Sequence, residues 1–223
     1  MRPVVIYSTA GRGKRVVSTS RFPWQLGVRP GMPLAEAKTF IDRPAIGQGN
    51  VPEAHYQAVD GNGDLETLRK LALTCECFTP QFGIEESESP ECLRLDVTGC
   101  VHLFGDEQGM AASRVAECRR RRFQVRVGIA PTIGAAWAVA HVLAKPALPM
   151  VVPPPELSSI LLPLPVKSLR LTPNILTTLR ELGLRTVGQL RALPRASIPS
   201  RFGPLLLKRL DQAFGDEREF FVI

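Results

Sequence analysis

The strongest constraint on the fold is a change of hydrophobic period in the middle of the chain. Apolar and polar residues alternate over Phe82–Ile84 and again over Cys92–Val97, which predicts two strands joined through the polar turn Glu86–Pro90. A helix, a strand and a small-residue helix are predicted next, over Asp106 or Glu107 to Cys118, Gln124–Ile129 and Thr132–Leu143. This order predicts an α+β fold in which helices cover a sheet, and the ferredoxin-like arrangement is a natural candidate.

The segment before this region predicts a small basic module. It holds two short strands, Val4–Tyr7 and Arg15–Thr19, and a helix over Pro33–Phe40 bounded by glycine and proline. A polar stretch with four glycines follows and predicts a loop or a weak boundary, at Gly47, Gly49, Gly61 and Gly63. We then expect Asp64 to cap an amphipathic helix whose apolar face holds Leu65, Leu68, Leu71, Ala72 and Cys75.

The segment after this region predicts a compact all-α module behind a proline-rich connector, Val151–Pro155. Thr172 and Pro173 begin a helix that runs to Leu182, and Gly183 ends it. Two further helices are predicted, one capped by Thr186 over Val187–Leu193 and one over Pro204–Phe214.

Charge indicates a polyanionic partner. The formal net charge is +7, and it is distributed as +6 over residues 1–45, −7 over 46–100, +4 over 101–150 and +4 over 151–223. Basic ends around an acidic middle suit contact with a phosphate backbone, although most charged side chains only solvate a surface. A composition of 44% hydrophobic and 22% charged residues excludes wholesale disorder.

Targeting and redox features are few. No apolar stretch reaches the length of a membrane span and no signal peptide is visible, so we expect a cytoplasmic protein without membrane partners. In that compartment we expect the five cysteines to stay free, at Cys75, Cys77, Cys92, Cys100 and Cys118.

The clearest nucleic-acid motif is the turn between two short helices at Leu182–Leu190. Backbone N–H groups at a helix N-terminus can face a DNA phosphate, and Arg185 with Thr186 would reinforce this contact. An ordinary turn of a helical bundle with solvated arginines is the alternative. Further positive charge nearby comes from Arg180, Arg191, Arg195, Arg201, Lys208 and Arg209.

Carboxylates cluster around the predicted hairpin, at Glu85, Glu86, Glu88, Glu91 and Asp96. Two-metal phosphoryl transfer needs several converging carboxylates. Strand alternation places Asp96 on the face of Cys92 and Arg94, opposite to Glu91, and a thiol is a poor magnesium ligand. A solvated turn is therefore favoured over a metal site.

Other clusters carry weaker signals. Cys75 and Cys77 lack zinc-type partners and indicate core packing, and the three histidines, His55, His102 and His141, have no evident catalytic companion. Gly11 and Gly13 beside Lys14 lack the P-loop spacing. The run Arg119–Arg122 suits a solvated helix C-terminus, with phosphate contact as the alternative.

Five segments, taken in order, resemble the Y-family (translesion) DNA polymerases and more specifically their ImuB branch. They cover nearly the whole chain and consist of Gly27–Ala37, Leu93–Gly105, Gly128–Ala138, Leu182–Leu190 and Leu193–Pro204. The resemblance implies fingers at residues 1–52, a ferredoxin-like palm at 53–152 and a helix-hairpin-helix thumb at 153–223. It also implies that the little finger and the clamp-binding tail would lie beyond Ile223, and that the first palm strand, with its metal-binding aspartate, would precede Met1.

This sequence departs from the family pattern at the catalytic positions. Where active members carry Ser-Ile-Asp-Glu, the chain reads Ser89, Pro90, Glu91 and Cys92. The family's triphosphate-binding tyrosine and arginine fall on Arg21 and Trp24, and its triphosphate-binding lysine falls on Trp137. We therefore expect no catalysis, no bound metal and no cofactor.

The resemblance implies a non-catalytic, nucleoid-associated bacterial protein that supports damage-induced mutagenic translesion synthesis. It would bind primer-template DNA and bridge a sliding clamp, an ImuA-like RecA-fold protein and an error-prone replicative-type polymerase. The expected DNA contacts are Arg185, Thr186, Gly188 and Arg191 in the thumb and Arg21 and Arg29 in the fingers. The alternatives are an active Y-family polymerase and a protein-interaction scaffold that does not bind DNA.

Overall fold

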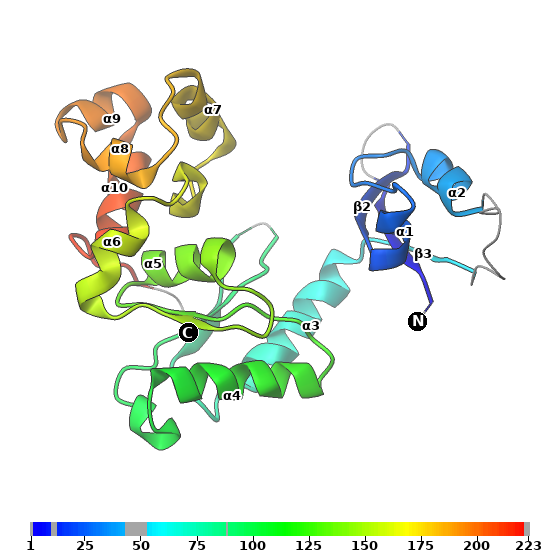
Figure 1. Cartoon of the computed structure of the whole chain (residues 1–223), viewed down its shortest axis with the longest axis horizontal. Helices are drawn as coiled ribbons and strands as arrows, with labels where there is room; N and C mark the ends of the chain where they lie inside the picture. The colour runs from blue at the N-terminus through cyan, green and yellow to red at the C-terminus, as the bar shows by residue number, and fades with distance from the viewer. Residues whose placement is uncertain (1, 10–12, 43–52, 88, 221–223) are drawn as a thin grey trace. The chain divides into compact units, whose positions relative to one another are not determined.

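The structure is a computed structural model that describes residues 2–9, 13–42, 53–87 and 89–220 (Figure 1). The chain forms two compact units, Met1–Thr67 and Leu68–Ile223, which are described separately. The predicted boundary at residue 52 lies outside the described residues, as do Gly11, Gly47, Gly49 and Glu88. Within the described ranges, no helix has the length and apolar character needed to cross a membrane.

The first unit is built on a three-stranded sheet in the order β2-β1-β3. Strand β1 (Val4–Ser8) pairs antiparallel with β2 (Arg15–Thr19) and parallel with β3 (His55–Ala58). Helices α1 (Arg21–Gln25) and α2 (Leu34–Asp42) follow β2. Apolar residues of β1, β2 and α2, with one residue after α1 and one before β3, form one core, made of Val5, Val16, Val28, Leu34, Ala37, Ile41 and Ala54.

The predicted strands and α2 are confirmed, whereas β3 was not predicted. The sequence of β3 reads His-Tyr-Gln-Ala, and three of its four residues are exposed, so no apolar alternation marks it. It forms because its backbone pairs with β1.

Helix α3 (Gly61–Leu73) begins three residues before the predicted N-cap at Asp64. The Asp60 carboxylate accepts a hydrogen bond from the Gly63 N–H at 3.0 Å, which is the role that the sequence assigned to Asp64. The glycines at 61 and 63, read as loop formers, therefore lie in the first turn of a helix.

The first part of the second unit contains two strand pairs and two helices. Strand β4 (Phe82–Ile84) pairs antiparallel with β5 (Leu93–Leu95), which confirms the predicted hairpin. A 3₁₀ turn (Val101–Phe104) precedes α4 (Glu107–Arg120), whose N-cap Asp106 accepts from the Gly109 N–H. Strand β6 (Gly128–Ile129) pairs parallel with β7 (Met150–Val151).

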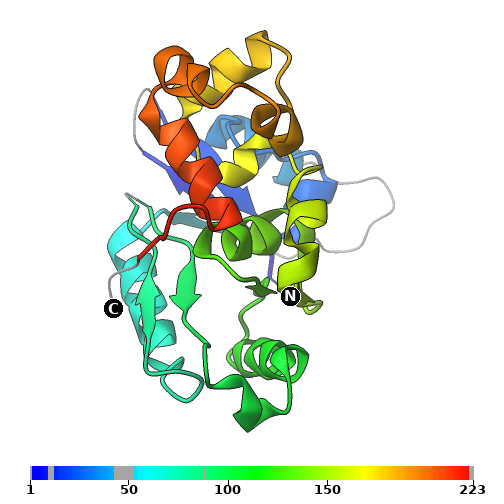
Figure 2. The ribbon, with the colours of Figure 1, turned by 90° about the vertical axis from the view of Figure 1, so that its left-hand side faces the viewer.

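Three predictions for this part need correction. The strand expected over Gln124–Ile129 is reduced to Gly128–Ile129, because only these residues pair with β7. The expected single sheet is observed, in the described residues, as two separate strand pairs, of which Figure 2 shows the β4–β5 pair as two large blue-green arrows. The segment read as a connector, Val151–Pro155, begins inside β7, because Val151 pairs with Ile129.

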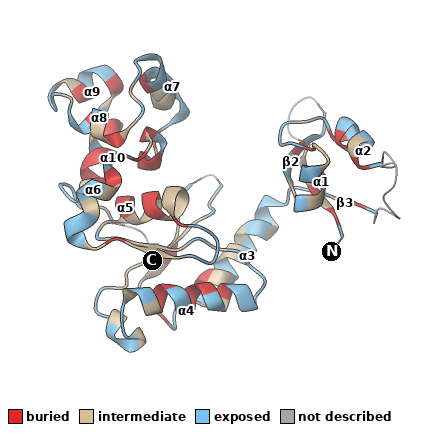
Figure 3. Ribbon diagram, in the orientation of Figure 1, coloured by how far each residue is buried: buried red, intermediate tan, exposed pale blue. Residues whose placement is uncertain are grey.

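The small-residue helix forms as expected but changes character midway. Helix α5 (Ile133–Ala138) begins where the Thr132 hydroxyl accepts from the Ala135 N–H at 3.0 Å, and it continues as a π-helical turn over Val139–Leu143. Burial follows the inner faces of α4 and α5 in Figure 3. Together with the strand pairs, these helices make the unit mixed α+β.

The C-terminal part of the second unit is all-helical, as predicted. Its longer elements are α7 (Pro173–Glu181) and α10 (Pro204–Phe214), and Gly183 adopts the left-handed conformation at φ +73° after α7. The hydroxyl of Thr172, expected to cap α7, makes no capping hydrogen bond. The shorter elements are 3₁₀ turns at Pro154–Glu156 and Val166–Leu169 and helices α6 (Leu157–Leu161), α8 (Val187–Arg191) and α9 (Ser197–Phe202).

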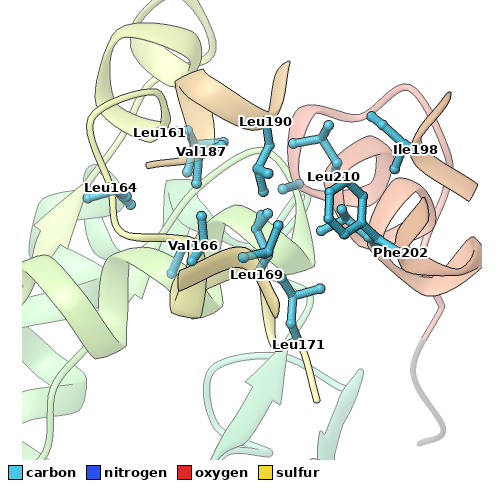
Figure 4. Packing of buried hydrophobic residues seen from close by; sticks show 14 of the residues in the cluster. Leu161, Leu164, Val166, Leu169, Leu171, Val187, Leu190, Ile198, Phe202 and Leu210 are labelled. Carbon is cyan, nitrogen blue, oxygen red and sulfur yellow. The ribbon is translucent and has the colours of Figure 1, made fainter. Parts of the chain in front are cut away.

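One hydrophobic core joins these helices to α5. It contains fully buried leucines and isoleucine from α6 to α10, shown in Figure 4, and it includes Ala135 and Ala138 of α5. Gly134 lies against the backbone of Ala213 in α10, and the Thr132 hydroxyl donates to the Ala213 carbonyl at 2.8 Å. Helix α5 and the helical part of this unit therefore share one packed interior.

Candidate functional site

The two residues at the expected catalytic register, Glu91 and Cys92, directly precede β5, the second strand of the hairpin. Glu91 is exposed over 78% of its side chain. Cys92, the next residue, is half-buried, and burial together with the charge of Glu85 raises the pKa of its thiol to about 11. At neutral pH the Cys92 thiol is therefore protonated, and a protonated thiol is a poor metal ligand.

Trp137 in α5 is another residue that the sequence marked as catalytic, and its side chain contacts Glu85 and His141. Its indole N–H donates to the Glu85 carboxylate at 3.0 Å, directly after β4. Its ring stacks on His141 at a centroid distance of 3.8 Å, and His141 Nε2 lies 3.8 Å from a Glu91 oxygen. The hairpin and α5 are thus joined by side chains at the positions that the sequence marked as catalytic.

The Glu85 carboxylate continues this arrangement into an ion-pair network. It lies 3.6 Å from the Arg94 guanidinium, whose other nitrogen lies 3.9 Å from Glu219. Arg170 holds both oxygens of Glu219, at 2.6 and 2.7 Å, and Arg209 of α10 adds a contact at 3.2 Å. We call Glu85, Arg94, Arg170, Arg209 and Glu219 the Glu219 network.

Within the Glu219 network, the electrostatics favour the ionised form of Glu219. Burial alone would raise the pKa of Glu219, but hydrogen bonds and charge from Arg170, with Arg209 and Arg94, hold it below its usual range. The pKa of Arg209 is lowered by burial and then by the like charge of Arg170. The charge of each buried carboxylate is therefore compensated by arginine.

This arrangement corrects two expectations from the sequence. Glu85, assigned to a solvated turn, is only 12% exposed and is bound by Trp137 and Arg94. His141, expected to lack a carboxylate companion, lies beside Glu91. Among the described residues, no three histidine, cysteine, aspartate or glutamate side chains are grouped so as to hold a metal ion.

The sequence did not predict that the side chains of the Glu219 network contact one another. Arg170 and Glu219 were not singled out, and they lie 49 residues apart in the chain. The only local signal is the spacing of four residues between Trp137 and His141, which places both on one side of a helix.

The turn that was predicted to bind nucleic acid forms directly before α8, but its backbone hydrogen bonds differ from those expected. The Thr186 hydroxyl accepts from the Gln189 N–H, and the Gln189 side chain accepts from the N–H groups of Arg185 and Thr186. The Gly188 N–H donates to the Leu162 carbonyl at 2.8 Å. The backbone donors that were expected to face phosphate are thus already bonded within the protein.

Side chains of this module remain at its surface. Arg185 is exposed, and no hydrogen bond or ion pair of its guanidinium is found among the described residues. Arg191 stacks over the Phe214 ring at 3.9 Å and lies 3.3 Å from Asp216, so its charge is partly compensated. Arg195 is compensated more fully by both oxygens of Asp211.

In the first unit, the marked residues gather around α1. Arg21 is its first residue and is exposed, while Trp24 is 47% exposed. The Arg29 guanidinium lies 4.1 Å from the centre of the Trp24 ring and donates to the Trp24 carbonyl at 2.6 Å. Trp24 and Arg29 therefore present one stacked aromatic and cationic surface.

The remaining predicted clusters behave as follows. All five cysteines are free, as expected. Cys75 is buried in agreement with core packing, but Cys77 is exposed and is not a core residue. The arginine run after α4 is partly paired, because Glu117 binds Arg120 and also Arg121, the latter at 2.7 Å.

Comparisons with known proteins converge on one group. The model of the impB/mucB/samB family matches residues 1–141. The chain is 36% identical over 194 residues to Protein ImuB of Caulobacter vibrioides (strain NA1000 / CB15N), covering 87% of this chain and 39% of that protein. It is 30% identical over 213 residues to DNA polymerase IV of Dehalococcoides mccartyi (strain CBDB1), covering 91% and 49% respectively. The chain thus spans less than half the length of these curated relatives.

Solved structures show the same fold. The insertion ternary complex of Dbh DNA polymerase matches with a TM-score of 0.73 and 21% identity, over 97% of this chain and 61% of that one. DinB from Sulfolobus solfataricus matches with a TM-score of 0.71 and 21% identity, over 98% and 61%. At this identity the likeness shows the fold alone.

Proposed function

Because this chain belongs to the impB/mucB/samB family of Y-family DNA polymerases, we propose that it is a non-catalytic member that binds DNA during damage-induced mutagenic translesion synthesis. The observation that carries the proposal is made at the expected catalytic register, where the Glu91 side chain is 78% exposed and the Cys92 thiol is protonated at neutral pH. The 36% identity to a protein named ImuB supports placing it in that branch.

The chemistry of nucleotidyl transfer argues for the absence of catalysis. Two magnesium ions need converging oxygen ligands and a cationic clamp for the triphosphate. Here Glu91 extends into solvent, Cys92 offers a neutral thiol, and Trp137 stands where the family's lysine would lie. Cys92 and Trp137 cannot replace the carboxylate and the cation that the reaction requires, and Glu91 is left as a single carboxylate at this register.

Charge and exposure support DNA binding without extension. The chain carries a net charge of +7, and exposed arginines occur at Arg185 before α8 and at Arg21 and Arg29 in the first unit. Guanidinium groups bind phosphate oxygens and give affinity with little sequence preference. Arg191 contributes once its ion pair with Asp216 opens, whereas Thr186 and Gly188 act mainly by shaping the turn.

We assign the first part of the chain to fingers (1–52), the next to a palm (53–152) and the last to a helix-hairpin-helix thumb (153–223). The family resemblance implies bridging of a sliding clamp, an ImuA-like protein and an error-prone replicative-type polymerase. It also implies a cytoplasmic, nucleoid-associated location.

A salt titration of binding to a fluorescent primer-template tests the DNA-binding claim. Affinity should fall steeply with salt, and Arg185→Glu should weaken binding and lower the salt slope by about 1 or more. Arg119→Glu, at the exposed end of α4, changes the net charge equally and should have a smaller effect. Absence of binding at low salt would contradict the proposal and favour a scaffold that does not contact DNA.

An active translesion polymerase is the second candidate function, because the chain is also 30% identical to a DNA polymerase IV. In that case a carboxylate at the hairpin must act on metal, and Glu91 is the exposed one. Primer extension that disappears in Glu91→Ala would establish this alternative.

A further inference from the structure

The C-terminal end of helix α4 places an arginine where the backbone favours glycine. The Phe123 N–H donates to the Cys118 carbonyl and the Arg122 N–H to the Arg119 carbonyl, both at 2.9 Å, and Arg122 has φ +66°. Helix α7 ends in the same pair of hydrogen bonds, but there the left-handed residue is Gly183. A side chain destabilises the left-handed conformation because its Cβ crowds the backbone. Arg122 therefore weakens the helix end that it forms, which is typical of positions kept for a function.

Arg122 belongs to a dense group of exposed arginines, which we call the α4 arginine cluster. It consists of Arg119, Arg120, Arg121, Arg122 and Arg126. Glu117 binds Arg120 and Arg121, and it is the only acidic residue in the sequence from 108 to 155. Among the described residues, neither Arg119 nor Arg122 has an ion pair or a side-chain hydrogen bond. These two guanidinium groups are therefore available to a partner.

The helix macrodipole accounts for little of this charge. A helix C-terminus carries about half a negative elementary charge, and its effect is confined to the last turn. Five arginines against one glutamate give residues 117–126 a net charge of +4. Arg122 and Arg126 also lie beyond Arg120, the last residue of α4. Most of the positive charge therefore remains for an acidic partner.

An exposed aromatic ring among the arginines favours a protein partner. Phe123 is 40% exposed and directly follows Arg122. Arginine and aromatic side chains are enriched at protein–protein interfaces, where a guanidinium group pairs with a carboxylate through two hydrogen bonds. Helix α4 and helices α7 to α9 lie at opposite ends of the second unit in Figures 1 and 2. The cluster is therefore a surface separate from Arg185, the exposed arginine proposed for DNA contact.

We propose that the α4 arginine cluster and Phe123 form the docking site of a short acidic segment of another protein. Arg119 and Arg122 hold carboxylates of that segment, and Phe123 contacts an apolar side chain that lies among them. The segment lacks basic side chains, because the cluster would repel them. This inference concerns a second binding surface and does not depend on the proposed DNA binding.

Fluorescence anisotropy with a labelled acidic peptide tests the proposal. The probe is a peptide of six glutamates around a central leucine, added to the 223-residue protein at low salt without DNA. We expect binding that weakens as the salt concentration is raised. A peptide with the same label and with glutamines in place of the glutamates should bind at least about tenfold more weakly, because its side chains are neutral. Equal binding of the two peptides, or no binding of the acidic one, would overturn the proposal, and this comparison needs no variant of the protein.

Charge reversal on the protein separates the cluster from the helical part of the unit. Arg119→Glu and Arg122→Glu should each weaken peptide binding about fivefold or more, whereas Arg185→Glu, equal in charge, should change it less than about twofold. Equal weakening by all three would assign the effect to net charge and contradict the proposal. A greater loss of primer-template binding in Arg122→Glu than in Arg185→Glu would assign the cluster to nucleic acid and would also contradict it.

Arg122→Gly removes the side chain and the unfavourable backbone conformation together. We expect it to raise the midpoint of thermal unfolding and to weaken binding of the acidic peptide about fivefold. A lower midpoint would show that the side chain stabilises the helix end, and unchanged peptide binding would show that it holds no carboxylate. Either result would overturn the proposal.

Discussion

Replacing Glu219 by glutamine removes the carboxylate that three arginines share. The Glu219 and Arg170 side chains are each only 8% exposed, and Arg170 holds both carboxylate oxygens at 2.6 and 2.7 Å. Breaking a buried pair by removing one partner costs about 3 to 5 kcal/mol, because the remaining charge stays buried and uncompensated. We therefore expect Glu219→Gln to lower the free energy of unfolding by about 3 kcal/mol or more.

Urea unfolding followed by tryptophan fluorescence measures this loss. Glu217→Gln is the matched control, because Glu217 is 44% exposed and lies 3.9 Å from Lys208, and it should change stability by less than about 1 kcal/mol. Equal effects of the two substitutions would refute the reasoning, since they would show that the buried pairs contribute no more than a surface contact.

The pH dependence of stability gives an independent check on the same residue. The pKa of Glu219 is lower in the folded protein than its ordinary value of 4.5, so the folded state favours the ionised form. Its contribution is present above pH 4.5 and is lost as the pH falls through the folded pKa. Glu219→Gln should therefore flatten the acid limb of the stability curve, and an unchanged limb would contradict the assignment.

Three shorter predictions test other parts of the structure. Thr186→Ala removes the capping box of α8 and should lower the free energy of unfolding by about 1 kcal/mol in urea titration, with no loss expected if the cap is not formed. Gly134→Ala places a Cβ 2.9 Å from the Ala213 Cα, so calorimetry should show a destabilisation of about 1 to 3 kcal/mol. The Cys92 thiol, with its pKa raised to about 11, should react with iodoacetamide far more slowly at pH 7.5 than exposed Cys77, and mass spectrometry of the alkylated peptides would show equal rates if burial were absent.

Elements with local signals could be predicted from the sequence. The strand period of the hairpin and the N-caps at Asp106, Thr132 and Thr186 lie within a few residues of the structure that they specify. Each cap supplies an acceptor for a backbone N–H that would otherwise be unsatisfied, so its effect does not depend on the rest of the fold.

Features that depend on distant residues could not be predicted in this way. Strand β3 carries no apolar pattern and exists through its pairing with β1, and β7 consists of two residues paired with β6. The contact from Trp137 to Glu85 spans 52 residues, and the pair between Arg170 and Glu219 spans 49. The hairpin could therefore be located from the sequence, but the internal partners of its carboxylate could not.

The most direct test of a DNA-binding protein without catalysis is extension of a labelled primer while that primer is bound. The 223-residue protein is added to a primer-template at low salt until fluorescence anisotropy shows saturation, and magnesium and all four nucleotides follow. Our account predicts that the primer stays bound and keeps its length, because Glu85 is held by Trp137 and Arg94 and Cys92 is a neutral thiol. Extension by the wild-type chain that is lost in Glu91→Ala would contradict it.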